Sequence, residues 1–348
     1  MHAPKGANAR KRQLQMKKFF VILFATLLAV QCTLSQQRTS TADSATLSSA
    51  ICLADSVSSW LHFLASDDMR GRANGSPEIE IAAQWLTEKF EYVGLQPVCE
   101  INGFVQAYFL NNDSSFVHKN IIGYFPASNE QDSNTSFIVI SAHFDHIGIA
   151  RNPVNGDSIF NGADDNASGV VAMLAIAKKL YRMNAQTNHP ILFTAFSNEE
   201  VGIRGSRYFV ESGFIPMQQV KLNINLEMLG RSHEFGRNKF YITGPSQSNF
   251  QDIVVAFNEG TDWEIEDVGP VAESLFRRSD NISFFAYAER NNFCIPAHTV
   301  ATSVGTGHIH RVYDEVEFID FENLNNIIAH LTQLILHISN SGIAVMCN

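Results

Sequence analysis

Residues 137–144 read FIVISAHF and residues 191–196 read ILFTAF, two continuous apolar runs of strand length with many β-branched side chains. Between them, residues 169–183 read GVVAMLAIAKKLYRM, in which apolar side chains recur at helical spacing. A strand, a helix and a second strand in succession predict two parallel strands joined by a helical crossover. Further runs of the same kind are NIIGYF (120–125), LNINL (222–226) and IPAHTVAT (295–302).

Apart from LNINL, these strands do not alternate polar with apolar residues, which is typical of a sheet that is buried on both faces. We therefore predict an α/β fold with a mostly parallel central sheet covered by helices on both faces, in a single domain. The 348 residues, 45% of them hydrophobic and 17% charged, are sufficient for a large core. Residues 37–49 are rich in Ser, Thr and Ala and are predicted to be a linker, residues 50–340 the folded domain and residues 341–348 a tail.

The first 36 residues have the pattern of an export signal. Basic residues precede the apolar run FFVILFATLLAV (19–30), and no acidic residue occurs before Asp43. This run is short for a membrane span of about 20 residues, so we predict a cleaved signal peptide over residues 1–36, with Met16 as an alternative start. The protein would then be secreted or periplasmic and without a membrane span. An uncleaved anchor and a lipid attached to Cys32 are the alternatives.

Export would leave a strongly acidic chain with four cysteines. Removing the six basic residues up to Lys18 from the formal net charge of −10 leaves about −16. Such a charge argues against nucleic acid as a partner. The four cysteines are widely spaced, so disulfides are possible in an oxidising compartment, but the sequence leaves their pairing open.

Polar side chains follow three of the predicted strands directly. His143 and Asp145 come after the first run, Glu199 and Glu200 after ILFTAF, and Glu227 after LNINL. In sheets of this class, ligands bind at the carboxyl ends of the strands. A carboxylate near a histidine can accept its second ring proton, and adjacent glutamates can divide metal binding from proton transfer. The sequence therefore predicts a metal site at this edge of the sheet.

Two adjacent acids, Asp164 and Asp165, lie in the stretch NGADDNASGVVAML (161–174), directly before the predicted crossover helix. Like charges at this distance repel each other, so a chain that keeps them together uses them for a cation, a helix cap or a turn. Taken alone, each of these polar stretches has a structural explanation. Together they favour a shared metal site.

In order along residues 50–340, several stretches resemble the co-catalytic di-zinc aminopeptidases, whose relatives include secreted bacterial leucyl aminopeptidases, glutamate carboxypeptidase II and glutaminyl cyclases. They are HFLASDDMRGRANGS, QWLTEKFEYVGLQP, KNIIGYF, SAHFDHIG, NGADDNASG, FSNEEVGIRGSRYF, NINLEMLGR, RRSDNISFF and HRVYDEVEFID. The resemblance implies a phosphorylase/hydrolase-like zinc exopeptidase architecture. It also implies two zinc ions per chain and peptide substrates.

Residue by residue, the resemblance implies that His143 and Glu227 bind one zinc ion, that Glu200 and His310 bind the other, and that Asp164 bridges them. Glu199 would be the general base, Asp145 would orient His143, and Asp165 would follow Asp164 through a cis peptide. His310 is preferred to His308 because Asp314 lies four residues after it, as in the family's closing motif. His146, His233 and His298 are interpreted as surface or satisfied core histidines.

The activity that this resemblance implies is that of a secreted metallo-aminopeptidase, which hydrolyses the first residue from a peptide. A glutaminyl-peptide cyclotransferase on the same fold, generally with one zinc ion, is the main alternative. An exopeptidase acting on acidic carboxy-terminal substrates and a non-catalytic binding protein are further alternatives. The residue preference and the oligomeric state are left open.

Overall fold

The computed structural model describes residues 45–101, 103–110, 113–128 and 136–348. The predicted signal peptide, residues 1–36, lies outside the described residues. The predicted linker lies partly inside them, and the first described helix, α2 (Ala45–Leu64), begins five residues earlier than the predicted domain start. Among the residues described, no helix is both long and apolar enough to cross a membrane.

The predicted α/β architecture is confirmed. Within the described ranges, a central nine-stranded sheet has the order β1-β3-β7-β4-β8-β11-β9-β10, and β2 pairs with β3. Its strands are β1 (Gln96–Pro97), β2 (Val105–Leu110), β3 (Asp113–Phe125), β4 (Phe137–His143), β7 (Ile191–Phe196), β8 (Val220–Leu226), β9 (Lys239–Ile242), β10 (Glu264–Ile265) and β11 (Ala297–Ala301). Strands β7, β4, β8 and β11 are parallel, whereas β3 and β9 run antiparallel to their neighbours β7 and β11. The carboxyl ends of the four central strands therefore meet at one edge.

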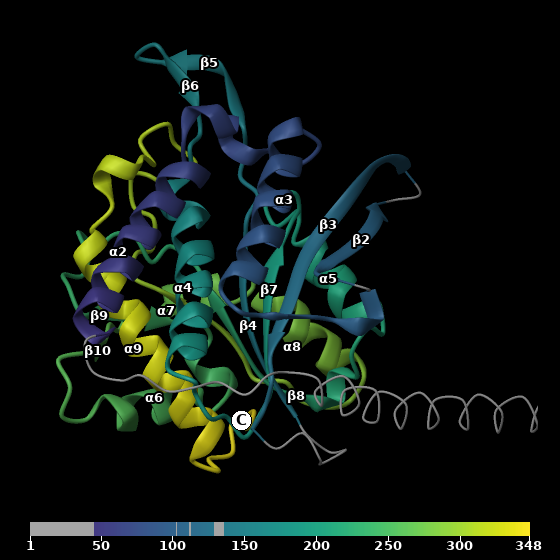
Figure 1. Ribbon diagram of the computed structural model, residues 1–348, viewed down its shortest axis with the longest axis vertical. Coiled ribbons are helices and arrows are strands. Elements are labelled where there is room, and N and C mark those ends of the chain that lie inside the picture. The colour runs from purple at the N-terminus through teal and green to yellow at the C-terminus, as the bar shows by residue number, and fades with distance from the viewer. Residues whose placement is uncertain (1–44, 102, 111–112, 129–135) are drawn as a thin grey trace, which may run out of the picture.

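Helices cover both faces of this sheet (Figure 1). One face carries α2, α3 (Pro77–Tyr92), α4 (Gly169–Arg182), α6 (Phe250–Asn258) and α9 (Phe321–Asn340). The other face carries α5 (Arg204–Glu211) and α8 (Asn281–Arg290). The remaining short elements are α7 (Pro270–Leu275), the 3-10 turns η2 (Asp67–Arg72), η3 (Cys99–Ile101), η5 (Met217–Gln219), η6 (Pro245–Gln247) and η7 (Val316–Phe318), the π-turn η4 (Ala163–Ser168), and a hairpin of β5 (Ile149–Val154) and β6 (Asp157–Ile159).

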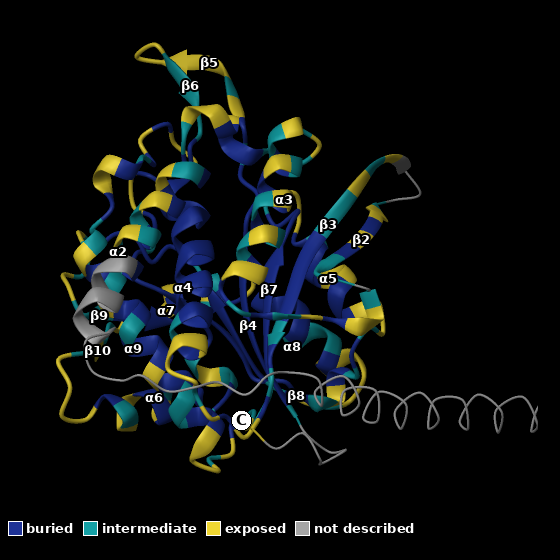
Figure 2. Cartoon of the chain, viewed as in Figure 1, coloured by how far each residue is buried: buried dark blue, intermediate teal, exposed yellow. Residues whose placement is uncertain are grey.

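Strand β4 shows why the sequence lacks alternation. All seven of its residues are buried, and successive side chains point to opposite faces. Ile138 and Ile140 pack in the core beneath α4, whereas Val139 packs in the core beneath α5 and α8. Both faces of the strand therefore carry apolar residues packed in a core, and Figure 2 shows the central strands in the dark blue of buried residues.

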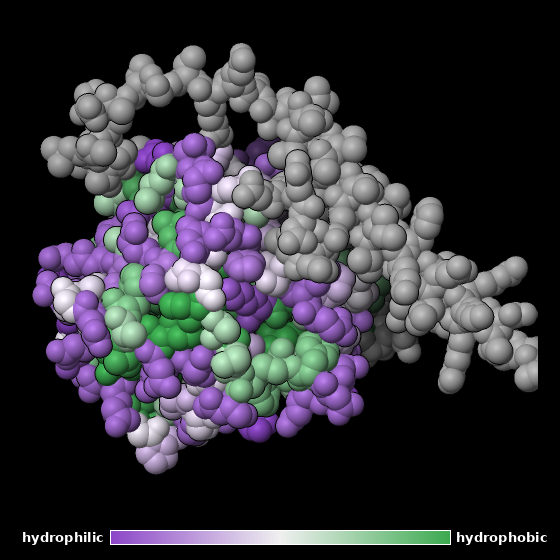
Figure 3. All heavy atoms as spheres, turned by 90° about the horizontal axis from the view of Figure 1, so that it is seen from below, coloured by the Kyte–Doolittle hydropathy of each residue, from purple (hydrophilic) through white to green (hydrophobic). Residues whose placement is uncertain are grey.

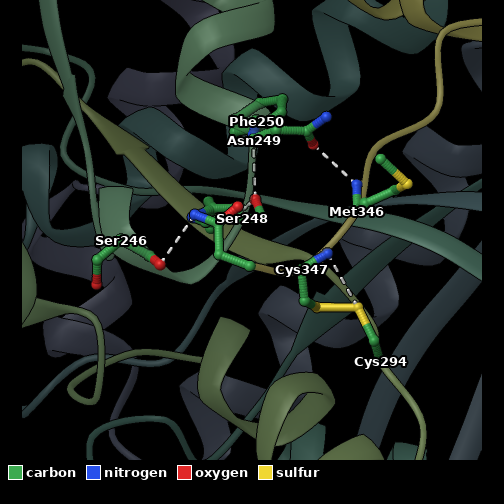
Figure 4. The surroundings of a disulfide bond; sticks show 9 residues. Ser246, Ser248, Asn249, Phe250, Cys294, Met346 and Cys347 are labelled. Atoms are coloured by element: carbon green, nitrogen blue, oxygen red, sulfur yellow. Dashed lines mark hydrogen bonds between the residues drawn. A yellow bond between two sulfur atoms is a disulfide. The ribbon is translucent and has the colours of Figure 1, made fainter.

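The end of the chain is fastened to the domain. Cys294, which precedes β11, forms a disulfide with Cys347, and Ser248 forms an isolated β-bridge with Cys347 (Figure 4). The pairing that the sequence left open is thus Cys294–Cys347. The segment predicted as a tail is held against the loop before α6.

Apolar surface patches and the side chains singled out from the sequence lie at opposite ends of the sheet. Seen from below, the surface shows patches of apolar side chains bordered by hydrophilic ones (Figure 3). The side chains that the sequence singled out lie at the other end, where β4, β7, β8 and β11 end.

Candidate metal centre

His143 is the last residue of β4 and projects into a fully buried position. Its Nδ1 lies 3.2 Å from the backbone carbonyl oxygen of Asp145. Because a carbonyl oxygen only accepts, Nδ1 carries the proton and Nε2 keeps a lone pair. That buried Nε2 has no hydrogen-bond partner among the described residues, and it lies 3.4 Å from Asp165 Oδ1 and 3.7 Å from Glu227 Oε1. This arrangement of a buried imidazole and two carboxylates suits a divalent cation.

Asp165 also faces a second group of donors. Its Oδ2 lies 3.3 Å from His310 Nε2, and His310 Nε2 lies 3.0 Å from Glu200 Oε2. His310 comes from the loop after β11, and its side chain is 47% exposed, in contrast to the buried His143. The two oxygens of one carboxylate therefore turn toward two different groups of metal-ligating side chains.

Asp164, predicted to bridge the ions, points elsewhere. Its Oδ1 accepts a hydrogen bond from Gly230 N at 2.7 Å, and its Oδ2 lies 2.9 Å from His308 Nε2. The backbone of η4 directs the Asp165 carboxylate into the donor groups and the Asp164 carboxylate toward the β8 loop. The cis peptide is at Asp165–Asn166 and not at Asp164–Asp165.

Asp314 holds the backbone of both acids in place. Its Oδ1 accepts from Asp164 N and its Oδ2 accepts from Asp165 N, each at 2.9 Å. Gly162, at φ +60°, begins the same turn, and a Cβ there would lie 2.6 Å from the His146 ring. The turn therefore needs glycine at its start and a carboxylate across from it.

Asp145 contacts the neighbouring strand end more closely than it contacts His143. Its Oδ1 lies 3.8 Å from His143 Nδ1, whereas its carboxylate accepts from Glu199 N at 3.1 Å and from Glu200 N at 3.2 Å. Asn74 donates a further hydrogen bond to Oδ2. The side chain of Asp145 thus fixes the backbone of the two glutamates, and its own carbonyl oxygen orients His143.

Glu199 and Glu200 differ in their surroundings. Burial raises the pKa of Glu199 well above the usual glutamate range, and Glu227 and Asp280 add to the rise although His143 opposes it. Burial would also raise the pKa of Glu200, but hydrogen bonds with His146 and His310 bring it below the usual range. Two adjacent carboxyl groups with separated pKa values are typical of divided roles in acid–base chemistry.

His146 is the first residue that the sequence reasoning missed. We predicted a surface or satisfied core histidine, but its buried ring places Nδ1 at 2.9 Å from Glu200 Oε1 and 3.7 Å from Asp165 Oδ2. Its Nε2 has no hydrogen-bond partner in the described part of the chain. His146 directly follows Asp145 after β4, so its position at the strand end was the available signal.

Arg72 and Asp280 are two further missed residues. The buried Arg72 guanidinium donates to the carbonyl oxygens of Leu64, Phe144, Asn161 and Gly162 at 2.6–3.0 Å, and burial lowers its pKa to about 10. It joins the loop after β4 to the loop before η4. Asp280, fully buried before α8, has its pKa raised to about 7 by burial, although His143 opposes the shift. Neither residue carries a sequence signal beyond its place in a quoted motif.

A model of peptidase family M28 matches residues 120–335, more than half of the chain. The chain belongs to peptidase family M28. This family assignment agrees with the resemblance and with the location of the donor groups, all of which fall within the matched residues.

Individual relatives are more distant. A probable leucine aminopeptidase of Trichophyton verrucosum is 29% identical over 255 residues, covering 70% of this chain but 62% of the relative. Aminopeptidase YwaD of Bacillus subtilis is 29% identical over 133 residues, covering 38% of this chain and 26% of the relative. The chain thus spans less than two thirds of the length of these curated relatives.

Solved structures share the fold. LapB from Legionella pneumophila has a TM-score of 0.61 at 19% identity, covering 84% of this chain and 75% of that one. A glutaminyl cyclase from Porphyromonas gingivalis has a TM-score of 0.58 at 17% identity, covering 81% and 97%. At these identities the likeness concerns the architecture alone.

Proposed function

We propose that the protein is a metallo-aminopeptidase and that Asp165, which lies between two donor groups, would help to hold each of two zinc ions. The observation that carries this proposal is the division of Asp165 between two donor groups, with Oδ1 toward His143 and Oδ2 toward His310. His143 and Glu227 would complete the first site, and Glu200 and His310, with the nearby His146, would hold the second ion. Imidazole and carboxylate ligands of this kind suit zinc.

The zinc ions, when bound, supply Lewis acidity that polarises the scissile carbonyl and lowers the pKa of water. Glu199 is the residue that moves the proton. Its carboxyl group lies in the same cluster of donor atoms as His143 and Glu200, and burial raises its pKa, which suits a group that accepts a proton and returns it. Glu199 would take a proton from the attacking water and deliver it to the leaving amine.

Asp145 supports this chemistry through the backbone. By accepting hydrogen bonds from Glu199 N and Glu200 N, it holds the general base and a metal ligand in a fixed relation. Positioning of this kind matters because proton transfer requires hydrogen-bond distance in the reacting complex. Asp145 is therefore proposed as a positioning residue.

The test combines hydrolysis of aminoacyl-nitroanilides with metal analysis. We expect hydrolysis by the zinc-loaded chain, loss on chelation, recovery on zinc addition, and a fall of about 10²–10⁴-fold in kcat for Glu199→Gln with both ions retained. Hydrolysis that survives chelation, or a fully active Glu199→Gln, would overturn the proposal. One zinc ion per chain together with pyroglutamate formation from glutaminyl peptides would favour the cyclotransferase.

We also propose that the protein is exported. The basic and apolar pattern of residues 1–36 supports this, and so does the Cys294–Cys347 disulfide, since such bonds persist in oxidising compartments. Fractionation of producing cells, with sequencing of the mature amino terminus, tests the proposal. A chain that keeps Met1 or Met16 and stays in the cytoplasm would contradict it.

A further inference from the structure

A second group of metal-ligating side chains lies beside the proposed centre and is not used by it. It consists of His233 and Glu234, in the loop after β8, and His308, in the loop after β11. One ligand atom from each residue lies within 4.8 Å of the other two. Because β8 and β11 are adjacent and parallel, their following loops meet at the same edge of the sheet.

The two loops are already joined by Glu234. Its Oε2 accepts from Val304 N at 2.7 Å and its Oε1 accepts from Thr306 N at 2.6 Å. These hydrogen bonds hold the carboxylate next to the segment that leads into His308. A carboxylate oxygen has more than one acceptor site, so each oxygen keeps capacity for a cation.

His308 presents an unused nitrogen. Its side chain is 3% exposed, and its Nε2 lies 2.9 Å from Asp164 Oδ2. Since a carboxylate accepts, Nε2 carries the proton and Nδ1 has the lone pair in the neutral ring. The buried Nδ1 has no hydrogen-bond partner among the residues that the structure describes. Leaving such an atom without a partner costs free energy, and a bound cation would remove that cost.

His233 completes the group from the solvent side. Its ring centroid is 5.6 Å from that of His308, and its Nε2 is 3.9 Å from Glu234 Oε1. Its side chain is 51% exposed, so water can fill the remaining coordination positions. Two imidazoles and one carboxylate form a ligand set that zinc accepts.

We propose that His233, Glu234 and His308 form a separate site for a zinc-class divalent cation. Asp164 then has a definite purpose, because a carboxylate on the far ring nitrogen of a metal-bound histidine fixes its tautomer and raises its basicity. The site ties the loop that carries His310 to the loop after β8. It goes beyond the proposed function and does not require that the protein is a peptidase.

Equilibrium dialysis of the full chain against increasing free zinc, with elemental analysis, tests the site. The wild type is expected to bind one more zinc ion per chain than His233→Ala and than Glu234→Gln. This difference of one ion is independent of how many ions the centre at Asp165 holds. His62→Ala, which removes an exposed histidine on α2, is the matched control and should bind as many ions as the wild type.

Thermal unfolding gives a second readout. Zinc added beyond the amount that fills the centre at Asp165 should raise the Tm of the wild type and of His62→Ala, but not of His233→Ala. Equal zinc content in wild type and His233→Ala would overturn the site. Loss of one ion in His62→Ala as well would mean binding to surface histidines and would also overturn it. Failure of Glu199→Gln to reduce hydrolysis would instead contradict the proposed function alone.

Discussion

His308 Nε2 lies 2.9 Å from Asp164 Oδ2, and this contact, together with the Gly230 amide, accounts for both oxygens of that carboxylate. The carboxylate of the neighbouring Asp165 faces the donor groups around His143 and His310 instead. Asp164 and Asp165 have the same side chain and are adjacent in the chain, but they contact different groups. Separate substitutions of the two residues can therefore distinguish their roles.

Replacing Asp165 by asparagine should abolish metal binding at the centre, whereas Asp164→Asn should preserve most of it. The Asp165→Asn variant lacks the charge that two cations would share, so we expect a larger fall in hydrolysis than in Asp164→Asn. The Asp164→Asn variant keeps a side-chain oxygen for the Gly230 amide, so a loss of about 10–100-fold is expected, as for residues that support ligands. Zinc content and kcat measured on both variants check this order. The reverse order would restore Asp164 as the bridge.

His146→Ala should weaken zinc binding at the Glu200 side of the centre. The ring contacts Glu200 Oε1 at 2.9 Å and is buried, so its removal leaves the carboxylate less well held. We expect zinc affinity to fall about 10–100-fold, measured by competition with a chromophoric chelator. His62→Ala, on the exposed side of α2, serves as control. An unchanged zinc affinity in His146→Ala would mean that this residue is a core histidine without a role in zinc binding.

Arg72→Met should destabilise the fold strongly, because the carbonyl oxygens of Leu64, Phe144 and Asn161 lose this donor, whereas Gly162 O keeps a hydrogen bond from Ala167 N. The expected fall in the free energy of unfolding is several kcal/mol, because each buried acceptor left without a partner costs about 1–3 kcal/mol. Arg70→Met is the matched control, since Arg70 is exposed and its ion pair with Glu78 is worth about 0–1 kcal/mol. Urea unfolding measures both variants, and similar losses would contradict the role given to Arg72.

His298 should make the protein sensitive to acid. The ring is buried between Thr243 O at 2.7 Å and Ser248 Oγ at 2.6 Å, and burial lowers its pKa to about 4. The unfolded chain therefore binds this proton first, at a pKa near 6.5. Stability from the neutral ring is complete above about pH 6.5 and is lost as the pH falls toward about 4, by about 3 kcal/mol.

Urea unfolding of wild type and His298→Gln at several pH values between 7 and 4 checks this sign. The variant is expected to be less stable at neutral pH but to lose less stability on acidification than the wild type. His62→Gln should follow the wild type. If the free energy of unfolding of His298→Gln changes with pH as steeply as that of the wild type, the acid sensitivity comes from other groups.

The sequence predicted the parts of the centre that depend on sheet topology. His143, Glu199, Glu200 and Glu227 each lie at the end of a central strand or just after it, and parallel strand ends meet at one edge, so their proximity could be inferred before any coordinates. The sequence could not predict which of Asp164 and Asp165 faces the donor groups, because the direction of each side chain depends on the φ and ψ angles of a short turn. At Asp165 the φ and ψ angles are −103° and 94°, which are not helical values, and the residue type alone does not predict them.

Other parts depend on burial, which composition does not reveal. A polar residue such as Arg72 is usually exposed, and only the convergence of four carbonyl oxygens explains its burial. His146 and His308 are ordinary histidines in the sequence. Their significance appears only when a ring nitrogen is found buried beside carboxylates.

The donors proposed around Asp165 come from four separate strand ends and from the turn before α4, spread between His143 and His310. No short fragment of the chain contains a complete ligand set for either ion. Zinc capture would thus depend on long-range contacts that form late when the contacting residues are far apart in sequence. A chain that held zinc at the centre around Asp165 would have brought the ends of β4, β7, β8 and β11 together, so zinc bound at this centre would serve as a measure of correct folding.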